Sequence, residues 1–425
     1  MKRKASKMKS ELRRRTAKTT ILTNLAVGAI LAAAQVGFSS GEASGAEVAV
    51  VNGATESAKV DGESQKSVAG FDWTLDDGLL TLRDGEKVVF SYRYSFLEHE
   101  NVPKTDSRRG AGCYFYPLNG VDGENLTDLA PKDHYHHRGV FWTWPAVGVW
   151  EADGTKREYD LWTTNAPIRQ RFVRFLDRPT TGNGENGGDF AEFAVENGWF
   201  VGPNATKTDA ELDPTAKDGQ NGERVGERIA ENAPLYGEKV VTEIVRVKTG
   251  PIETFEGVRC RSVDVEIVLI PNEKPISLRG AEGKSYGGLT IRFRPVGKNG
   301  EDRFILTDEG LAKGDMPEKP LRWADFTSRF GAVDKETGEK NALSGAAIFL
   351  SPNFPDFPPT WLTRYYGPLC VGWPGVVEQK FEPGERIEMR ARIWLHEGLV
   401  AKEMLQKAFE RWAEEENRVK LAEAR

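Results

Sequence analysis

The chain has 425 residues and a formal net charge of −6, from 58 basic and 64 acidic side chains. Residues 1–46 hold nine of the basic and two of the acidic residues, so the remainder carries about −13, which argues against binding nucleic acid or anionic membrane. Three cysteines without a Cys-x-x-Cys pair exclude a cysteine-rich metal site and indicate small buried side chains rather than a disulfide framework.

The first predicted element is an N-terminal leader. Residues 1–18 are strongly basic, a short apolar stretch follows, and small residues come next. This order is typical of a secretory signal peptide, and the apolar core is shorter than the ~20 residues of a membrane span. We therefore predict a cleaved signal peptide over 1–46, a linker over 47–67 and an exported protein, periplasmic or extracellular. A leader retained as a membrane anchor is the alternative.

Residues 68–398 are predicted to form one β-rich domain. The Asp-Gly pair at 84–85 is a hairpin signal, and apolar residues alternate with polar ones, most clearly from Val263 to Leu269. Many short strands between Gly- and Pro-containing turns indicate a sandwich or barrel. We predict an all-β fold, a large antiparallel β-sandwich. The strand candidates are 73–96, 169–176, 191–201, 239–250, 259–271, 289–296, 345–351 and 386–398.

The segment KDHYHHRGVFWTWP, residues 132–145, holds three of the five histidines. If it is extended, His134, His136 and Arg138 share one face and His137 lies on the other. Such histidines can act as acid and base, and an arginine can stabilise developing negative charge. We predict that these four residues are catalytic. A hydrogen-bonded loop without catalytic function is the alternative.

The same histidines raise the question of a metal ion. His134 and His136 could bind one ion from adjacent positions on the same face, but a third ligand would have to come from elsewhere. We expect no cofactor, and a divalent metal at His134 and His136 stays open as an alternative.

Tryptophans and tyrosines recur in Gly- and Pro-rich segments after the histidines. Aromatic rings beside His, Arg and Asp suit a carbohydrate, because sugar C–H faces stack on rings and hydroxyls need polar partners. Asp325 in RWADF is expected to be a catalytic carboxylate that neutralises Arg138, with a turn or capping role as the alternative. Arg292 is expected to bind substrate, and a structural ion pair is the alternative role of this residue. The residues expected to bind substrate are Trp142, Tyr286, Arg292, Trp361, Arg364, Tyr366 and His396.

Two further regions differ from the strand pattern. Residues 176–238 are rich in Gly, Asn, Asp and Glu, and we predict an exposed polar insertion that contributes little to the core. Residues 399–425 are predicted to form a helix that packs on the β-domain. Its apolar positions, expected to share one face, are Leu399, Met404, Leu405, Ala408, Phe409 and Trp412.

The motif DHYHHRGVFW resembles the Asp-His-Pro-His-His-Arg-Gly-Leu-Trp signature of a bacterial PmoA-like family, a domain of unknown function whose members are also named methane oxygenase PmoA. The segments KSYGGLTIRF, RWADF and GAAIFLSPNFPDFPPTWLTRYYGPLCVGWPG resemble that family in the same order, from about Phe71 to Glu397. The sequence departs from the motif at Tyr135, where a phenol replaces the proline.

The resemblance implies a fold similar to the carbohydrate-active β-supersandwich group, which includes galactose mutarotases, polysaccharide lyases and glycosidases. Membrane-embedded methane oxidation is rejected, because no stretch after the leader is long and apolar enough to span a membrane. We expect an exported carbohydrate-active protein: a hydrolase, lyase or epimerase. The alternatives are a non-catalytic glycan-binding or cell-surface module and a metal-dependent enzyme.

Overall fold

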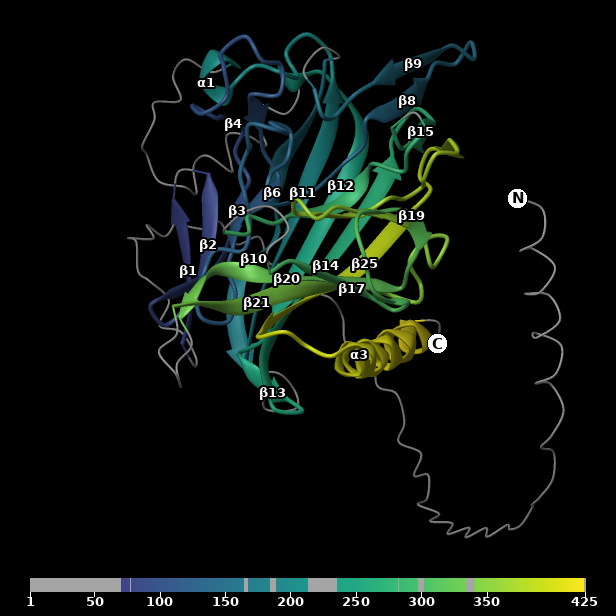
Figure 1. The fold of residues 1–425 in the computed structure, drawn as a ribbon. Coiled ribbons are helices and arrows are strands. Elements are labelled where there is room, and N and C mark those ends of the chain that lie inside the picture. The colour runs from purple at the N-terminus through teal and green to yellow at the C-terminus, as the bar shows by residue number, and fades with distance from the viewer. Residues whose placement is uncertain are drawn as a thin grey trace, which may run out of the picture. The chain divides into compact units, whose positions relative to one another are not determined.

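A computed structural model describes residues 70–76, 78–163, 167–183, 189–212, 235–281, 283–296, 302–333 and 340–423. The predicted signal peptide (residues 1–46) and linker (residues 47–67) lie outside the described residues. All elements below belong to the described part of the chain (Figure 1).

A nine-stranded sheet forms one layer of the fold, and its printed strand pairs are antiparallel. The hairpin formed by strands 79–84 and 87–93 turns at Gly85, whose φ of 58° is a left-handed conformation that favours glycine, as the Asp-Gly signal predicted. In spatial order the strands are β1 (Phe71–Asp76), β2 (Leu79–Asp84), β3 (Lys87–Arg93), β6 (Tyr114–Leu118), β7 (Val140–Thr143), β16 (Gly288–Arg292), β23 (Pro368–Val371), β22 (Thr360–Thr363) and β19 (Met316–Pro320).

A ten-stranded antiparallel sheet forms the second layer. Its path runs β10 (Ile168–Asn183), β11 (Asp189–Val201), β12 (Glu238–Thr249), β14 (Val258–Pro271), β25 (Ile387–Glu397), β21 (Lys340–Leu350), β20 (Trp323–Val333), β17 (Phe304–Thr307) and β18 (Gly310–Leu311), with β13 (Glu253–Phe255) beside β14. The prediction of an all-β fold with a large antiparallel sandwich is confirmed.

The main core lies between the two large sheets. Phe90 of β3 packs 6.5 Å from Phe193 of β11, and Phe293 stacks on Phe326 of β20 at 4.8 Å, both measured between ring centroids. The alternating residues Val263 to Leu269 place their apolar side chains in this core. The polar residues between them, Asp264 and Glu266, pair with arginines on the opposite face of the sheet.

The C-terminal helix α3 (Lys402–Glu423) packs on the outer face of the ten-stranded sheet. Leu405, Ala408, Phe409 and Trp412 are buried there against Trp394 and its neighbours, which confirms the predicted packing face. Leu399 is 52% exposed and precedes the helix, so this residue does not belong to that face.

The prediction that residues 176–238 form an exposed polar insertion outside the core is partly wrong. Strand β11 and the end of β10 fall inside this range, and Phe193, Val195 and Trp199 of β11 are core residues. The strand predicted at 191–201 is present as β11, but its apolar inner face lies in the core and not in an exposed insertion. A four-residue helix, α1 (Asp209–Leu212), also lies in the range, and residues 213–234 lie outside the described residues.

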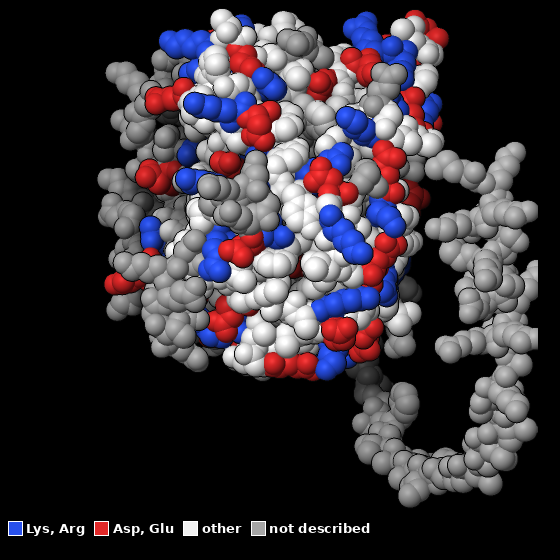
Figure 2. Space-filling model, viewed as in Figure 1, with Lys and Arg blue, Asp and Glu red and all other residues white. Residues whose placement is uncertain are grey.

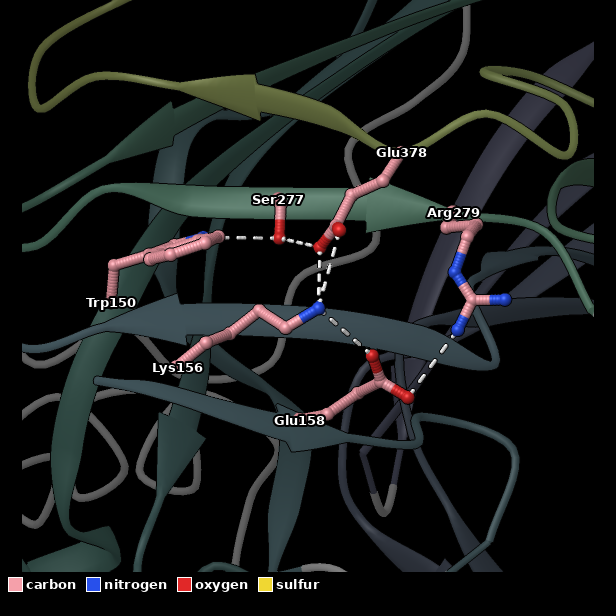
Figure 3. A network of polar contacts seen from close by, with 6 residues as sticks. All are labelled: Trp150, Lys156, Glu158, Ser277, Arg279 and Glu378. Atoms are coloured by element: carbon pink, nitrogen blue, oxygen red, sulfur yellow. Dashed lines mark hydrogen bonds and ion pairs between the residues drawn. The ribbon is translucent and has the colours of Figure 1, made fainter. Parts of the chain in front are cut away.

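Two small sheets complete the fold: β4 (Leu97–Glu98) with β5 (Gly110–Ala111), and a four-stranded sheet of β24 (Gln379–Phe381), β15 (Ile276–Arg279), β8 (Ala146–Trp150) and β9 (Lys156–Tyr159). Figure 3 shows a polar network that links the latter's strands. Lys156 Nζ lies 2.9 Å from Glu378 and 3.3 Å from Glu158. Ser277 donates to Glu378 and accepts from the Trp150 indole at 3.2 Å. These contacts join side chains across strands that are far apart in sequence.

The surface carries both signs of charge. In Figure 2, Lys and Arg lie interspersed with Asp and Glu on the visible face. Within the described residues, no helix is sufficiently long and apolar to cross a membrane. The three cysteines are free and buried, as predicted.

Candidate functional site

The histidine motif connects β6 to β7 and is not extended. His134 N–H donates to the carbonyl of Pro131 at 2.9 Å, and His137 N–H donates to the carbonyl of His134 at 3.0 Å. These backbone bonds form two successive turns, so the predicted alternation of faces is wrong. The turns bring residues three apart onto the same side, and the imidazole of His134 stacks on that of His137 with centroids 4.7 Å apart.

Aromatic rings from three other segments surround these histidines. Tyr366 stacks on His134 at 5.2 Å, and Trp162 stacks on His136 at 4.8 Å. Tyr286 meets the edge of Trp162 at 6.2 Å. We call the set His134, His136, His137, Trp162, Tyr286 and Tyr366 the ring cluster. The structure thus unites motif residues with two tyrosines predicted from distant segments.

A line of polar contacts runs through the exposed side of the ring cluster. His134 Nδ1 lies 3.1 Å from Asp133 Oδ2, and His134 Nε2 lies 3.5 Å from the Tyr366 hydroxyl. Arg292 donates to the same Asp133 oxygen at 2.8 Å and lies over the Tyr366 ring at 4.7 Å. The imidazole of His134 therefore lies between a carboxylate and a phenol, and its contact with Asp133 is at an ion-pair distance without hydrogen-bond geometry.

Arg364 extends this line. Its Nε donates to the Tyr286 hydroxyl at 3.4 Å, and its Nη1 lies 3.5 Å from Asp315. Predicted substrate residues Tyr286, Arg292, Arg364 and Tyr366 consequently lie at one site with His134.

Arg138 is buried, with 4% of its surface exposed. Its guanidinium donates to the backbone carbonyls of Tyr135, His137 and Arg108. The expected pairing with Asp325 is wrong, because carbonyl oxygens of nearby loops hold this arginine instead. Arg138 fixes the turns of the motif, and it also lines a small cavity beside the ring cluster.

The surroundings of the site shift the pKa values of its titratable groups in different directions. Burial, and then Coulombic interactions with His134 and Arg138, lower the pKa of His136 to about 3. Burial also lowers the pKa of His137 well below its ordinary value. Burial acts to raise the pKa of Asp133, but His134 and Arg292 outweigh it and the pKa is lowered. Burial and the neighbouring Tyr286 raise the pKa of Tyr366. At neutral pH the phenol is therefore protonated and the Asp133 carboxylate ionised.

Asp325 and His396 form a separate pair. His396 Nε2 lies 2.9 Å from Asp325 Oδ1, both side chains are fully buried, and Thr327 donates to the other carboxylate oxygen at 2.8 Å. Trp323, on the same face of β20, packs towards α3, whereas Phe326 faces the nine-stranded sheet. Asp325 therefore lies on the side of β20 away from the ring cluster. The prediction that Asp325 and His396 join the site is wrong.

Trp142 and Trp361 belong to the core. Both are fully buried between the sheets, and the Trp361 indole donates to the carbonyl of Leu321 at 2.8 Å. Their strands turn these side chains inward, so the expected role in substrate binding is not supported. Trp162, which is half-buried and stacked on His136, takes the position expected of them.

Residues that the sequence interpretation missed line a cavity of about 40 Å³ beside the ring cluster. Thr143 of β7 and Arg169 of β10 face it together with Trp162, His136 and Arg138. The only sequence signal was the run RQRFVRFL, in which charged residues occupy a predicted strand. A larger groove of about 330 Å³ lies beside α3, where Arg246 and Arg390 both pair with Glu266.

No group of three or more His, Cys, Asp or Glu side chains that could hold a metal ion occurs in the part of the chain that the structure describes. Within the described ranges, the structure therefore adds no third His, Cys, Asp or Glu ligand to His134 and His136, and a metal there stays an alternative.

Comparison with known proteins identifies a family whose function is not known. No curated protein matches the sequence. A family of unknown function (DUF6807) matches residues 80–410, which include the ten-stranded sheet, the nine-stranded sheet apart from β1, the ring cluster and the start of α3. The chain therefore belongs to this family of unknown function, DUF6807.

Proposed function

We propose that the protein is a carbohydrate-active enzyme that transfers protons at the ring cluster, with His134 as the central group. The observation that carries the proposal is the position of its imidazole, 3.1 Å from the Asp133 carboxylate and 3.5 Å from the Tyr366 hydroxyl. A carboxylate orients a histidine and stabilises its protonated form, and a phenol can donate a proton.

Two adjacent proton-transfer groups suit a sugar. His134 Nε2 would take a proton from one atom of the sugar while the Tyr366 hydroxyl returns one to a neighbouring oxygen. The Tyr366 phenolate formed is then reprotonated by His134, so that both groups return to their starting states. Mutarotation, epimerisation and elimination each require one group that takes a proton and another that gives one. Half-buried Trp162 and Tyr286 supply rings for the C–H faces of the sugar.

The sequence resemblance to the PmoA-like family and the analogy with β-supersandwich enzymes agree with this proposal, although a shared fold does not fix function. Export by the N-terminal leader belongs to the same proposal, because it would bring the protein to extracellular or periplasmic glycans. A non-catalytic glycan-binding module would use the same rings without proton transfer.

The experiment compares the protein with His134→Gln on a panel of oligosaccharides and acidic sugars, with masses and anomeric composition read out. General acid–base catalysis contributes on the order of 100-fold or more, so turnover should fall by that factor while sugar binding remains. His396→Gln, which removes a histidine of the separate buried pair, is the matched control and should keep turnover if it folds.

A gain of water would indicate hydrolysis, and cleavage without that gain would indicate elimination. Binding without turnover in the unmodified protein would favour the non-catalytic module. Equal turnover by the protein and His134→Gln would show that His134 is not the proton-transfer group.

A further inference from the structure

Four of the residues that line the cavity of about 40 Å³ each carry a buried hydrogen-bond donor without a partner. Nε of Arg138, Nε of Arg169, Nε1 of Trp162 and Oγ1 of Thr143 are buried and have no hydrogen-bond partner among the described residues. The three nitrogens can only donate, and the hydroxyl can also donate. A buried donor left without an acceptor costs about 1–3 kcal/mol. Four around one cavity therefore point to an acceptor that binds there.

The cavity is also positively charged. Arg138 and Arg169 are 4% and 5% exposed, and neither forms an ion pair with a carboxylate in the described ranges. Arg169 Nη1 donates to the carbonyls of Thr163 at 2.9 Å and Ile168 at 2.6 Å. Carbonyl oxygens orient a guanidinium without neutralising it. Burial lowers the pKa of Arg138 to about 10 and that of Arg169 to about 9, so both remain charged at neutral pH.

No Asp or Glu is among the described residues that line this cavity. The carboxylates with a Coulombic effect on the arginines are Asp160 for Arg169 and Asp106 for Arg138, and neither lines the cavity. Glu243, a buried carboxylate, accepts from Gln170 at 2.8 Å. Gln170 lines the cavity, whereas Glu243 accepts from Asn197 and Trp199 on its other sides. The excess positive charge thus faces the cavity, and a buried charge is stable only with a counter-charge or several hydrogen bonds.

The volume limits what can enter. A single water needs about 10–15 Å³ of such space, so about 40 Å³ admits a group of a few atoms and not a sugar ring. A carboxylate or a sulfate substituent fits this size and offers only acceptor oxygens. His136 and Trp162 belong to both the cavity wall and the ring cluster, so a substituent bound here would leave its sugar beside His134.

We propose that this cavity is an anion subsite that holds the carboxylate or sulfate substituent of an acidic sugar, with Arg138 and Arg169 as the charged donors. The assignment of the anion to a sugar rests on the proposed function of the ring cluster. Arginine forms strong paired hydrogen bonds to such groups, which makes it suitable for this selection.

The test measures binding of D-glucuronate, glucose 6-sulfate and D-glucose by calorimetry to the full chain, Arg169→Gln and Thr143→Val. Charge-assisted hydrogen bonds contribute about 1.5–3 kcal/mol, so one of the acidic sugars should bind about tenfold or more tightly than glucose. Arg169→Gln should abolish this preference, and Thr143→Val should reduce it about threefold. Arg261→Gln removes a buried guanidinium that pairs with Asp84 and should keep the preference.

The outcomes separate the two proposals. Equal binding of all three sugars, or a preference that survives both cavity variants, overturns the anion subsite and leaves sugar binding at the ring cluster intact. If no sugar binds, the proposed function fails, and titration with acetate and sulfate decides the subsite. Saturable stabilisation that Arg169→Gln abolishes would support it, and its absence would overturn it. Thr143→Val decides alone if circular dichroism shows that Arg169→Gln does not fold.

Discussion

Glu243 on β12 is fully buried, and three donors surround its carboxylate. Gln170 and Asn197 donate at 2.8 Å and the Trp199 indole donates at 2.7 Å. Burial raises the pKa of Glu243, while the Trp199, Asn197 and Gln170 hydrogen bonds act to lower it. This group links β10, β11 and β12 through side chains inside the core. Its surroundings contrast with those of Glu378, which is partly exposed in the network of Figure 3.

Removal of the Glu243 carboxylate should therefore be costly. Glu243→Ala removes one acceptor from each of three buried donors and leaves the Trp199 indole without any, so we expect the free energy of unfolding to fall by about 2–5 kcal/mol. Glu243→Gln keeps the volume and one acceptor oxygen, so its loss should be smaller. Glu378→Ala should cost less than about 1 kcal/mol, because partly exposed ion pairs contribute little. Urea unfolding measures all three, and equal losses for Glu243→Ala and Glu378→Ala would contradict the contrast.

At the scale of secondary-structure elements, sequence periodicity predicted the features that depend on local sequence. The β2–β3 hairpin, the alternating strand β14 and the buried face of α3 all follow from local sequence patterns. The polar-insertion interpretation of residues 176–238 failed, because local composition did not show which strand completes the core. Strand β11 was predicted at 191–201, yet its apolar inner face is part of the core.

The site was predictable to a smaller extent. The histidine motif was evident from its composition, and Tyr286, Arg364 and Tyr366 lie in the segments that resemble the PmoA-like family. The turns at His134 and His137 depend on backbone hydrogen bonds that side-chain alternation does not encode. Thr143 and Arg169 face one cavity from strands of different sheets, so only the packing of the two sheets reveals that they meet. Asp325 was assigned wrongly, since its motif gave no information about which side of β20 it faces.

For the whole molecule, buried histidines predict how stability depends on pH. Burial, with nearby arginines, lowers the pKa of His99 to about 3, and His136 also falls to about 3. An unfolded histidine titrates at about 6.5, so the unfolded chain binds more protons between these values. The free energy of unfolding should consequently fall as pH decreases from about 6.5 to 3, by up to about 1.4 kcal/mol per pH unit for each proton taken up.

Urea unfolding between pH 7 and pH 5 measures this dependence, and His99→Asn should make it less steep by removing one of the protons. An unfolding free energy that does not change over this range would mean that these histidines are not held neutral in the folded protein.

The central claim is that the ring cluster and the cavity beside it form one site for an acidic sugar. A crystal structure with bound D-glucuronate tests this claim most directly. The claim predicts the carboxylate within hydrogen-bond distance of the Arg138 and Arg169 guanidinium groups, with the sugar ring against Trp162 and next to His134. Glucuronate in the groove of about 330 Å³ beside α3, with only water between Arg138 and Arg169, would contradict it.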